Sequence, residues 1–466
     1  MSLRHPCACI PLVFVAALGA AVAPLLASAQ SATGTEVQDS EAWDDATWQT
    51  PANDDTDAEA WGDDDWGDDP WASDTPGWTW YGFIEGAYAG RVGSDPAIAE
   101  EATLSELRMQ LEGERRIGDF AARLKGDVWV DAVEDGVRGD LREANLEGTL
   151  AEDTDIRIGR QILTWGTGDL VFLNDLFPKD YVSFFSGRND EYLKAPSDAL
   201  RLSWYGPVNV DIVWMPVADP NRYIEGDRLS YFSPLAGARV ATTVDPDARD
   251  ELGDDSEFAL RVYQTRDGVE YAGYAYTGYD KQPSAVDPAS GTAYFPRLSV
   301  AGASVRSPLG EGIGNLETAW YEAEDDAGTD PNRPNDQLRF LAGYSHEPIA
   351  NLTLGWQYYL EWTQDHDALL DNLPDPQRRY APEEYRHVLT NRVTWQLLQQ
   401  DLTLSLFTFY SPSDADWYLR PRARYRFSDR LYGTVGGNLF GGEDDWTFHT
   451  QLEDNSNLYA RLRYSF

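Results

Sequence analysis

Arginine recurs at every second position in one stretch near the end of the chain, residues 417–427. Because successive side chains of a β-strand point to opposite faces, an alternating row of this kind lies on one face of a strand. The row consists of Arg420, Arg422, Arg424 and Arg426. A guanidinium group is planar and presents paired donors that match a carboxylate or a phosphate. The spacing therefore predicts a ladder of anion-binding groups, with steps of about 6.6–7 Å, along one strand.

Other arginines share the polar face of predicted strands and extend this set. They are Arg461, Arg463, Arg386, Arg392 and Arg339, with Arg261, Arg201, Arg123 and Lys125 on further strands. A charge that faces hydrocarbon at mid-bilayer costs roughly 2–4 kcal/mol in a barrel, so these side chains are expected to face inward. Acids share the inner face, mainly on the early strands, at Glu106, Glu112, Glu114, Asp127, Glu143 and Glu147. Two interpretations stay open: a path for anions, or simple cross-strand pairing of these arginines with the acids.

The elements that must position these side chains are strands. Segments of about ten residues between positions 78 and 466 alternate apolar and polar residues, and short and long connections separate them in turn. This pattern predicts an all-β fold, a transmembrane antiparallel β-barrel of about eighteen strands. A count of sixteen stays open, because 154–163, 296–307 and 313–323 alternate poorly. A barrel of this size encloses an aqueous channel rather than a packed core.

Residues 456–466 show the strictest alternation in the chain. The apolar row consists of Leu458, Ala460, Leu462, Tyr464 and Phe466, and it ends on an aromatic ring. A strand with one apolar and one polar face fits a wall between lipid and a wet lumen. We expect this strand to close the barrel against the first strand, with Tyr464 and Phe466 as the assembly signal.

The N-terminal part of the chain differs in composition from the predicted barrel. Residues 1–29 have Arg4, an apolar run and small residues before Ala29, which predicts a secretory signal peptide cleaved near Ala29. Both cysteines lie within it. Residues 30–76 contain many acids and recurring tryptophans but neither lysine nor arginine, a composition that predicts a disordered periplasmic arm. The net charge of −42 argues against a nucleic acid partner.

A long aromatic connection, residues 165–197, follows the fifth predicted strand. A loop this rich in aromatic side chains would be poorly soluble if it extended into water, so we expect it to fold inward and narrow the channel. An external loop packed on its neighbours is the alternative. The charged residues of the predicted constriction are Asp169, Asp175, Lys179, Asp180, Arg188, Asp190, Glu191 and Lys194.

These features together resemble a known class of protein. The strand count, the final Phe466, the arginine-lined interior, Gly159-Arg160-Gln161 and Trp165-Gly166 look like bacterial outer-membrane porins, nearest to the alginate-export type and other anion channels. In that family a basic lumen passes an anionic polysaccharide. The resemblance covers residues 78–466 and implies residence in the bacterial outer membrane, with its lipid and the barrel-assembly machinery as partners.

The sequence therefore predicts a channel for hydrophilic, anionic solutes or an anionic polysaccharide. The alternative is a structural barrel that binds a periplasmic or electron-transfer partner through the acidic arm. No HExxH, GxSxG, P-loop or dinucleotide-binding motif occurs, so we expect no enzyme activity, no catalytic residues, no cofactor and no metal site.

The acidic arm generates a first testable prediction. Removing residues 30–76 should leave a folded barrel, because a segment so acidic and so poor in aliphatic residues cannot form part of a packed core. Circular dichroism of the truncated protein should match that of the full chain. Loss of the β-sheet signal would show that the arm is structural, whereas a rise in single-channel conductance would show that it plugs the lumen.

Overall fold

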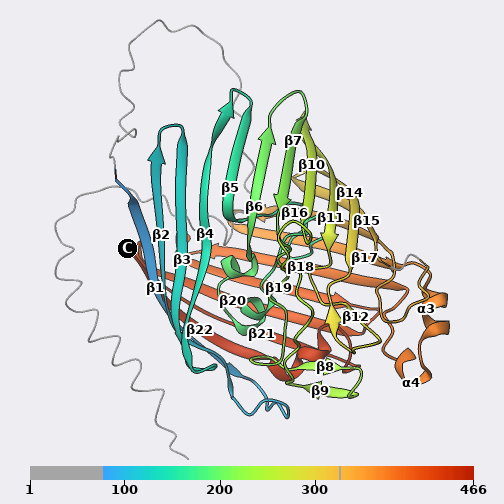
Figure 1. Ribbon diagram of the computed structural model, residues 1–466. Helices are drawn as coiled ribbons and strands as arrows, with labels where there is room; N and C mark the ends of the chain where they lie inside the picture. Colours follow the sequence, from blue (N-terminus) through green and yellow to red (C-terminus); the bar gives the residue numbers. More distant parts are fainter. Residues whose placement is uncertain (1–76, 325–326) are drawn as a thin grey trace, which may run out of the picture. The chain divides into compact units, whose positions relative to one another are not determined.

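The computed structural model describes residues 77–324 and 327–466, most of which belong to β-strands (Figure 1). The predicted signal peptide and acidic arm lie outside the described residues. Eighteen strands form one antiparallel sheet in which β1 pairs with both β2 and β22. The sheet is therefore a closed barrel, and closure leaves no edge strand with unpaired backbone groups.

The eighteen barrel strands have the following bounds: β1 (Thr79–Arg91), β2 (Ala102–Ile117), β3 (Phe120–Asp131), β4 (Gly136–Ala151), β5 (Thr154–Ile162), β6 (Pro196–Trp204), β7 (Asn209–Met215), β10 (Glu257–Arg266), β11 (Val269–Tyr279), β14 (Arg297–Leu309), β15 (Gly312–Glu322), β16 (Gln337–Ile349), β17 (Leu352–Thr363), β18 (Tyr385–Leu397), β19 (Leu402–Ser411), β20 (Asp416–Ser428), β21 (Leu431–Gly442) and β22 (Asn457–Ser465). The predicted count of eighteen is confirmed, and the alternative of sixteen is wrong. The three segments that alternate poorly are strands β5, β14 and β15, because small residues such as Gly302 replace large side chains there.

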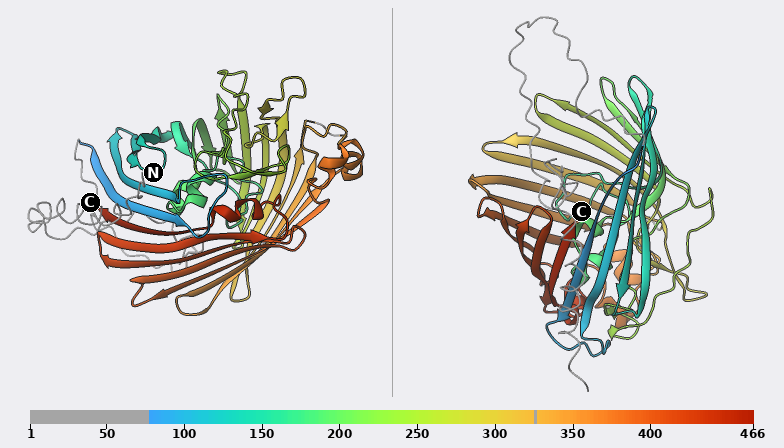
Figure 2. Two further views of the ribbon diagram at one scale, coloured as in Figure 1. Left: turned by 90° about the horizontal axis from the view of Figure 1, so that it is seen from below. Right: turned by 90° about the vertical axis from the view of Figure 1, so that its left-hand side faces the viewer.

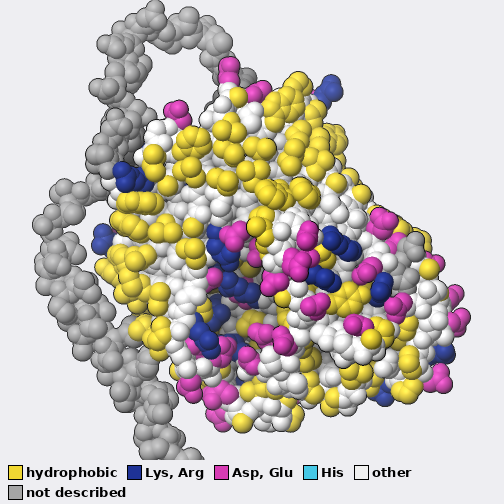
Figure 3. Space-filling view, viewed as in Figure 1, with side chains coloured by type: hydrophobic (Ala, Val, Ile, Leu, Met, Phe, Trp, Pro, Cys, Tyr) yellow, Lys and Arg dark blue, Asp and Glu magenta, His cyan; other side chains and the backbone are white. Residues whose placement is uncertain are grey.

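The two faces of the wall differ as the alternation predicts. On β22, Leu458 and Leu462 are 58% and 41% exposed on the outside, whereas Tyr459 and Arg463 are buried inside. Hydrophobic side chains form a broad belt over the strands, and charged side chains gather below it (Figure 3). An apolar outer belt around a charged interior is the arrangement of a barrel that spans a bilayer.

Short turns join the strands at one end of the barrel and longer connections join them at the other. The turn between β10 and β11 is Asp267-Gly268, with φ of 52° and 76°, which is the backbone of a tight hairpin turn. The longer connections carry the remaining elements: α2 (Tyr181–Ser186), η1 (Asp190–Leu193), β8 (Tyr231–Ser233), β9 (Ala238–Val240), β12 (Ala285–Val286), β13 (Ala293–Tyr294), α3 (His366–Asn372), α4 (Asp375–Arg378) and η2 (Thr450–Asn455). None of the helices in the described ranges has the length and apolar character needed to cross a bilayer.

The seam between β1 and β22 is held by backbone hydrogen bonds up to the last residue. The Gly82 amide donates to the Phe466 carbonyl at 3.1 Å, and the Phe466 amide donates to the Gly82 carbonyl at 2.9 Å. A Cβ atom at Gly82 would lie 2.5 Å from the Gln110 carbonyl oxygen and 3.0 Å from the Phe466 ring. Glycine is therefore required where the final aromatic ring crosses the first strand. Tyr464, the other residue of the predicted assembly signal, pairs in register with Ile84.

Deleting Phe466 should impair barrel assembly. The deletion removes both backbone hydrogen bonds to Gly82 and the ring that covers it. We expect loss of the compact, heat-modifiable form on gel electrophoresis, whereas Phe466→Tyr, which keeps the ring and the backbone, should assemble normally. A deletion variant with the same mobility shift as the intact protein would contradict this prediction.

Candidate functional site

The connection between β5 and β6, residues 163–195, lies against the inner face of the barrel wall (Figure 2). At one side Phe177 packs with Met215 of β7 and Val300 of β14. At another side Phe185 packs with Tyr418 of β20, which is fully buried. We call residues 163–195 the inner loop, since its apolar side chains contact separate parts of the wall from within.

Local sequence fixes the path of the inner loop around α2. The Asp180 carboxylate accepts a hydrogen bond from the Ser183 amide at 2.7 Å and caps the first turn. The helix ends at Gly187, whose φ of 101° favours glycine. A Cβ atom at Gly187 would lie 2.9 Å from the Tyr459 ring of β22, so this turn also allows close approach to the wall.

Asp190 of the inner loop meets the first half of the arginine ladder. Its carboxylate forms ion pairs with Arg420 and with Arg422, the second at 3.2 Å. Both guanidinium groups are almost fully buried, and that of Arg420 lies 4.4 Å from the centre of the Phe184 ring. One loop carboxylate is thus shared by two successive steps of the ladder.

Glu191, the next residue, reaches the seam between the last and first strands. Its carboxylate lies 2.8 Å from Arg463 Nη2, and Arg463 Nε lies 2.9 Å from Glu85 on β1. Arg461 lies 3.9 Å from the same Glu85 carboxylate. Two arginines therefore share Glu85, in the same way that two share Asp190.

Asp169 ties the inner loop to a third place on the arginine-bearing wall. Arg392 Nη2 donates to the Asp169 carboxylate at 2.8 Å. The Gln357 side chain accepts from the Asp169 amide at 2.7 Å and donates to the Asp169 carbonyl at 2.8 Å. The backbone and the side chain of this residue are both fixed on the wall.

On the early strands the inner loop contributes a base to an acidic wall. Arg188 Nε donates to Glu106 at 3.1 Å, and Arg108 binds the same carboxylate at 3.0 Å. The Tyr192 ring of the inner loop lies between two guanidinium groups, those of Arg108 and Arg142, each 4.5 Å from the ring centre. The inner loop thus carries acids toward the late strands and a base toward the early strands.

The remaining predicted site residues do not converge on the inner loop's acids. Arg386 pairs with Asp414 at 2.6 Å, Arg339 with Glu361 at 3.4 Å, and Arg426 with Asp401 at 2.9 Å. The Arg424 guanidinium lies 4.2 Å from the centre of the Tyr432 ring. Within the inner loop, Asp175 and Lys179 are buried as a pair at 2.9 Å, Asp180 binds Arg222 at 3.2 Å, and Lys194 donates to Thr164 at 2.8 Å.

Sequence reasoning missed Glu85, Arg108 and Arg142 as members of this network. Arg108 shares the alternation of Glu106, so the sequence carried a signal for it. Arg142 carried none, because a register shift in the β3–β4 pairing places Arg142 and Glu143 together at a bulge. A bulge adds a residue to one strand and breaks the simple alternation of faces.

Charged neighbours control the pKa values of the inner loop's acids. Burial raises the pKa of Glu191, but Arg463, Lys125 and Arg142 outweigh that effect and lower it to about 2. Burial likewise raises the pKa of Asp190, and Arg420 and Arg422 outweigh it, so this pKa lies well below its usual range. Both carboxylates therefore stay ionised at neutral and mildly acidic pH.

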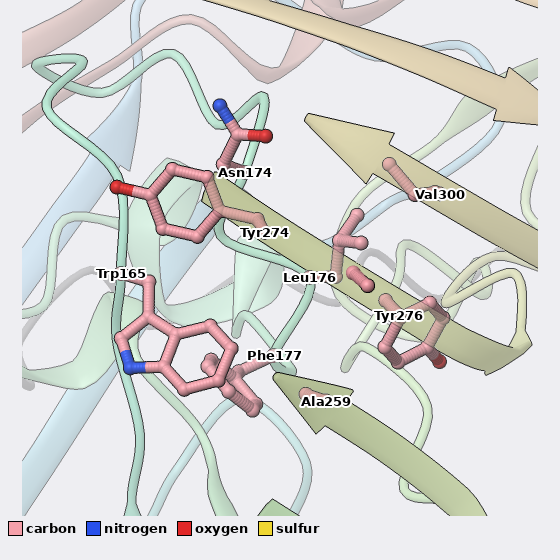
Figure 4. Close-up of a pocket in the computed structure, with 9 residues that line it drawn as sticks. Trp165, Asn174, Leu176, Phe177, Ala259, Tyr274, Tyr276 and Val300 are labelled. Carbon is pink, nitrogen blue, oxygen red and sulfur yellow. The ribbon is translucent and has the colours of Figure 1, made fainter. Parts of the chain in front are cut away.

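A small cavity of about 10 Å³ lies between the inner loop and strands β10, β11 and β14 (Figure 4). The Trp165 and Phe177 rings lie next to each other, with centroids 5.0 Å apart. The residues that line it are Trp165, Asn174, Leu176, Phe177, Ala259, Tyr274, Ala275, Tyr276 and Val300. Since none of these side chains is charged, the cavity does not offer a binding site for an anion.

Comparison with solved structures places this fold among known barrels. The chain is similar to OccAB3 of Acinetobacter baumannii, with a TM-score of 0.52 at 9% identity over 84% of this chain and 99% of that one. It is also similar to OccAB1 of the same species, with a TM-score of 0.50 at 10% identity over 84% of this chain and 96% of that one. The Occ proteins are outer-membrane porins, and at this identity the likeness establishes a shared fold. No protein-family model and no curated protein sequence matches the chain.

Glu191 should hold the inner loop on the wall at a pH at which a glutamate with an unshifted pKa would already be protonated. A carboxylate whose pKa falls on docking stabilises the docked loop above its free pKa of 4.5, and this stabilisation is lost as the pH falls toward 2. Single-channel current should therefore be steady from neutral pH to about 4.5 and become noisy only below it. Glu191→Gln should bring the noise to neutral pH. Noise in the unmodified channel at neutral pH, or a quiet Glu191→Gln channel, would contradict the prediction.

Proposed function

We propose that this chain is a channel of the bacterial outer membrane that passes hydrophilic, anionic solutes through an arginine-lined lumen. The closed eighteen-stranded barrel, its apolar belt and its porin-like fold support residence in a membrane. Barrels with this number of strands enclose an aqueous channel. In outer-membrane barrels the short turns are periplasmic and the long connections extracellular, so the inner loop enters the lumen from outside.

The observation that carries the proposal is the sharing of carboxylates among arginines on the late strands. Asp190 serves Arg420 and Arg422, and Glu85 serves Arg461 and Arg463. Glu191 is a third acid beside these arginines, since it also pairs with Arg463, so three carboxylates meet four guanidinium groups and the bases outnumber the acids by one among these groups. Conduction of an anion needs several sites that are each favourable but weak enough to release it. The buried arginines Arg420, Arg422, Arg461 and Arg463 would act through their field, and the partly exposed Arg392 and Arg424 on the same wall would offer the contact sites.

On the early strands the acids Glu106, Asp127 and Asp131 equal in number the arginines Arg108, Arg188 and Arg228 that bind them. Glu106 binds Arg108 and Arg188, and Asp131 binds Arg228, so acids and bases alternate within one buried network. These ion pairs hold the inner loop on the wall. Because opposite charges alternate within the network, their fields largely cancel, and little net field acts on a solute. We therefore assign the anion path to the wall of β18, β20 and β22, and the constriction to the inner loop that faces it.

Replacing Arg420, Arg422, Arg424 and Arg426 together by glutamine should shift selectivity toward cations. The substitutions remove positive charge and also release Asp190 from its partners. A unit charge about 4 Å from an ion in water changes its energy by about 1 kcal/mol, so the anion-to-cation permeability ratio should fall by about fivefold or more. The reversal potential in a salt gradient across a planar bilayer measures this ratio.

A matched control is Arg266→Gln, an exposed arginine at the turn between β10 and β11. This variant should keep the selectivity of the unmodified channel. A channel that is already cation-selective, or a reversal potential that the four substitutions leave unchanged, would show that the arginines serve only to pair with lumen acids.

A further inference from the structure

Two arginines at the loop end of the barrel face outward rather than into the lumen. Arg297 begins β14 and is exposed, and its guanidinium carbon lies 4.2 Å from the centre of the Tyr279 ring. Arg249, from the connection between β7 and β10, lies 5.1 Å from the centre of the same ring. Since both contact one ring, the two guanidinium carbons are within about 9 Å of each other.

Arg249 differs from the other arginines of its own connection, residues 216–256. Arg222 binds Asp140 at 2.8 Å, Arg228 binds Glu134 at 2.8 Å and Arg239 binds Asp454 at 2.7 Å. Within the described parts of the chain, neither Arg249 nor Arg297 forms an ion pair. Each donates instead to a backbone carbonyl, Arg249 to that of Phe295 at 3.3 Å and Arg297 to that of Asp254 at 3.4 Å.

The nearest carboxylate that the structure places against this ring is already engaged. One oxygen of Asp255 accepts the Tyr279 hydroxyl at 2.7 Å, and the other accepts the Glu251 amide at 3.1 Å. Arg249 and Arg297 thus share one ring and bind backbone carbonyls, while the carboxylate beside that ring has other partners. Two like charges held together in this way favour an anion with several acceptor oxygens.

The position of the pair relative to the membrane follows from strand register. Phe258 and Trp320 are outward-facing rings, 49% and 40% exposed, near the loop end of their strands. Outward aromatic rings of this kind mark the interface between hydrocarbon and head groups. Phe258 pairs with Thr277, and Tyr279 is the next outward-facing position of β11, about 6.6–7 Å beyond that ring. Arg297 pairs with Tyr279, so the two arginines lie at the level of the lipid head groups.

We propose that Arg249 and Arg297, stacked on Tyr279, bind the phosphate group of a lipid in the outer leaflet. A phosphate monoester offers acceptor oxygens to both guanidinium groups, and acyl chains of the same lipid would cover the apolar belt below them. Leu252, three residues after Arg249 and 78% exposed, is placed to contact the same lipid. The proposal rests on the proposed function in one respect, that the loop end of the barrel faces the outer leaflet.

The test measures lipid binding by the full-length protein in detergent, with native mass spectrometry as the readout. Diphosphoryl lipid A is the probe, because it carries phosphate monoesters on an acylated sugar. The double variant Arg249→Gln/Arg297→Gln should bind it about tenfold or more weakly than the unmodified protein, since two charge-assisted contacts are lost. The control is Arg115→Gln/Arg116→Gln, two exposed arginines at the opposite end of the barrel, which should bind as the unmodified protein does.

Three outcomes would overturn the proposal. Equal affinity of the double variant and the unmodified protein would show that the arginines are not the site. Equal affinity for dephosphorylated lipid A would show that acyl chains alone are bound. Displacement of the lipid by inorganic phosphate at equal concentration would assign the site to a free anion.

Conductance of the same variants separates this proposal from the proposed function. The double variant should conduct normally, because both side chains lie on the outer face. A protein that binds diphosphoryl lipid A through these arginines but does not conduct would refute the channel and leave the lipid site standing.

Discussion

Arg463 joins the three parts of the barrel that must come together: the last strand, the first strand and the inner loop. It is 2% exposed, lies 3.7 Å from the centre of the Phe83 ring, and pairs with Glu85 and with Glu191. Removing one partner from a buried ion pair costs about 3–5 kcal/mol, because the other charge is left without compensation. Closure of the wall and placement of the inner loop therefore depend on each other, and neither is stable in the same form without the other.

The same constraint explains why the interior uses arginine. A guanidinium group offers five donors in a rigid plane, so it can bind one carboxylate side-on while it lies flat on a ring. Arg420 does so between Asp190 and Phe184, and Arg463 between Glu85 and Phe83. A lysine in either place would keep the charge but would lose the stacked contact and the second hydrogen bond.

The sequence predicts which segments form the strands of the wall, but it predicts only part of the network of ion pairs inside. The reason is physical. Alternation is a local property, so the eighteen strands and the inward faces of Arg420 and Arg463 follow from neighbouring residues alone. Pairing is not local: Arg463 and Glu85 are 378 positions apart, and Arg420 and Asp190 are 230 apart. Which acid meets which arginine depends on closure of the sheet and on the path of the inner loop. The bulge at Arg142 is a third case, where one extra residue changes a face without any compositional signal.

The net charge of the chain, −42, does not indicate whether the lumen favours anions or cations. Charges on outer connections are screened over about 10 Å at 0.1 M salt, whereas the ladder steps of about 6.6–7 Å are shorter than that distance. Neighbouring arginines therefore act on a solute together. Under the proposed function, Asp190 already occupies the place that a solute carboxylate would take between Arg420 and Arg422. A passing anion would then meet guanidinium groups whose charge is already partly balanced, which keeps each site favourable enough to enter and weak enough to leave.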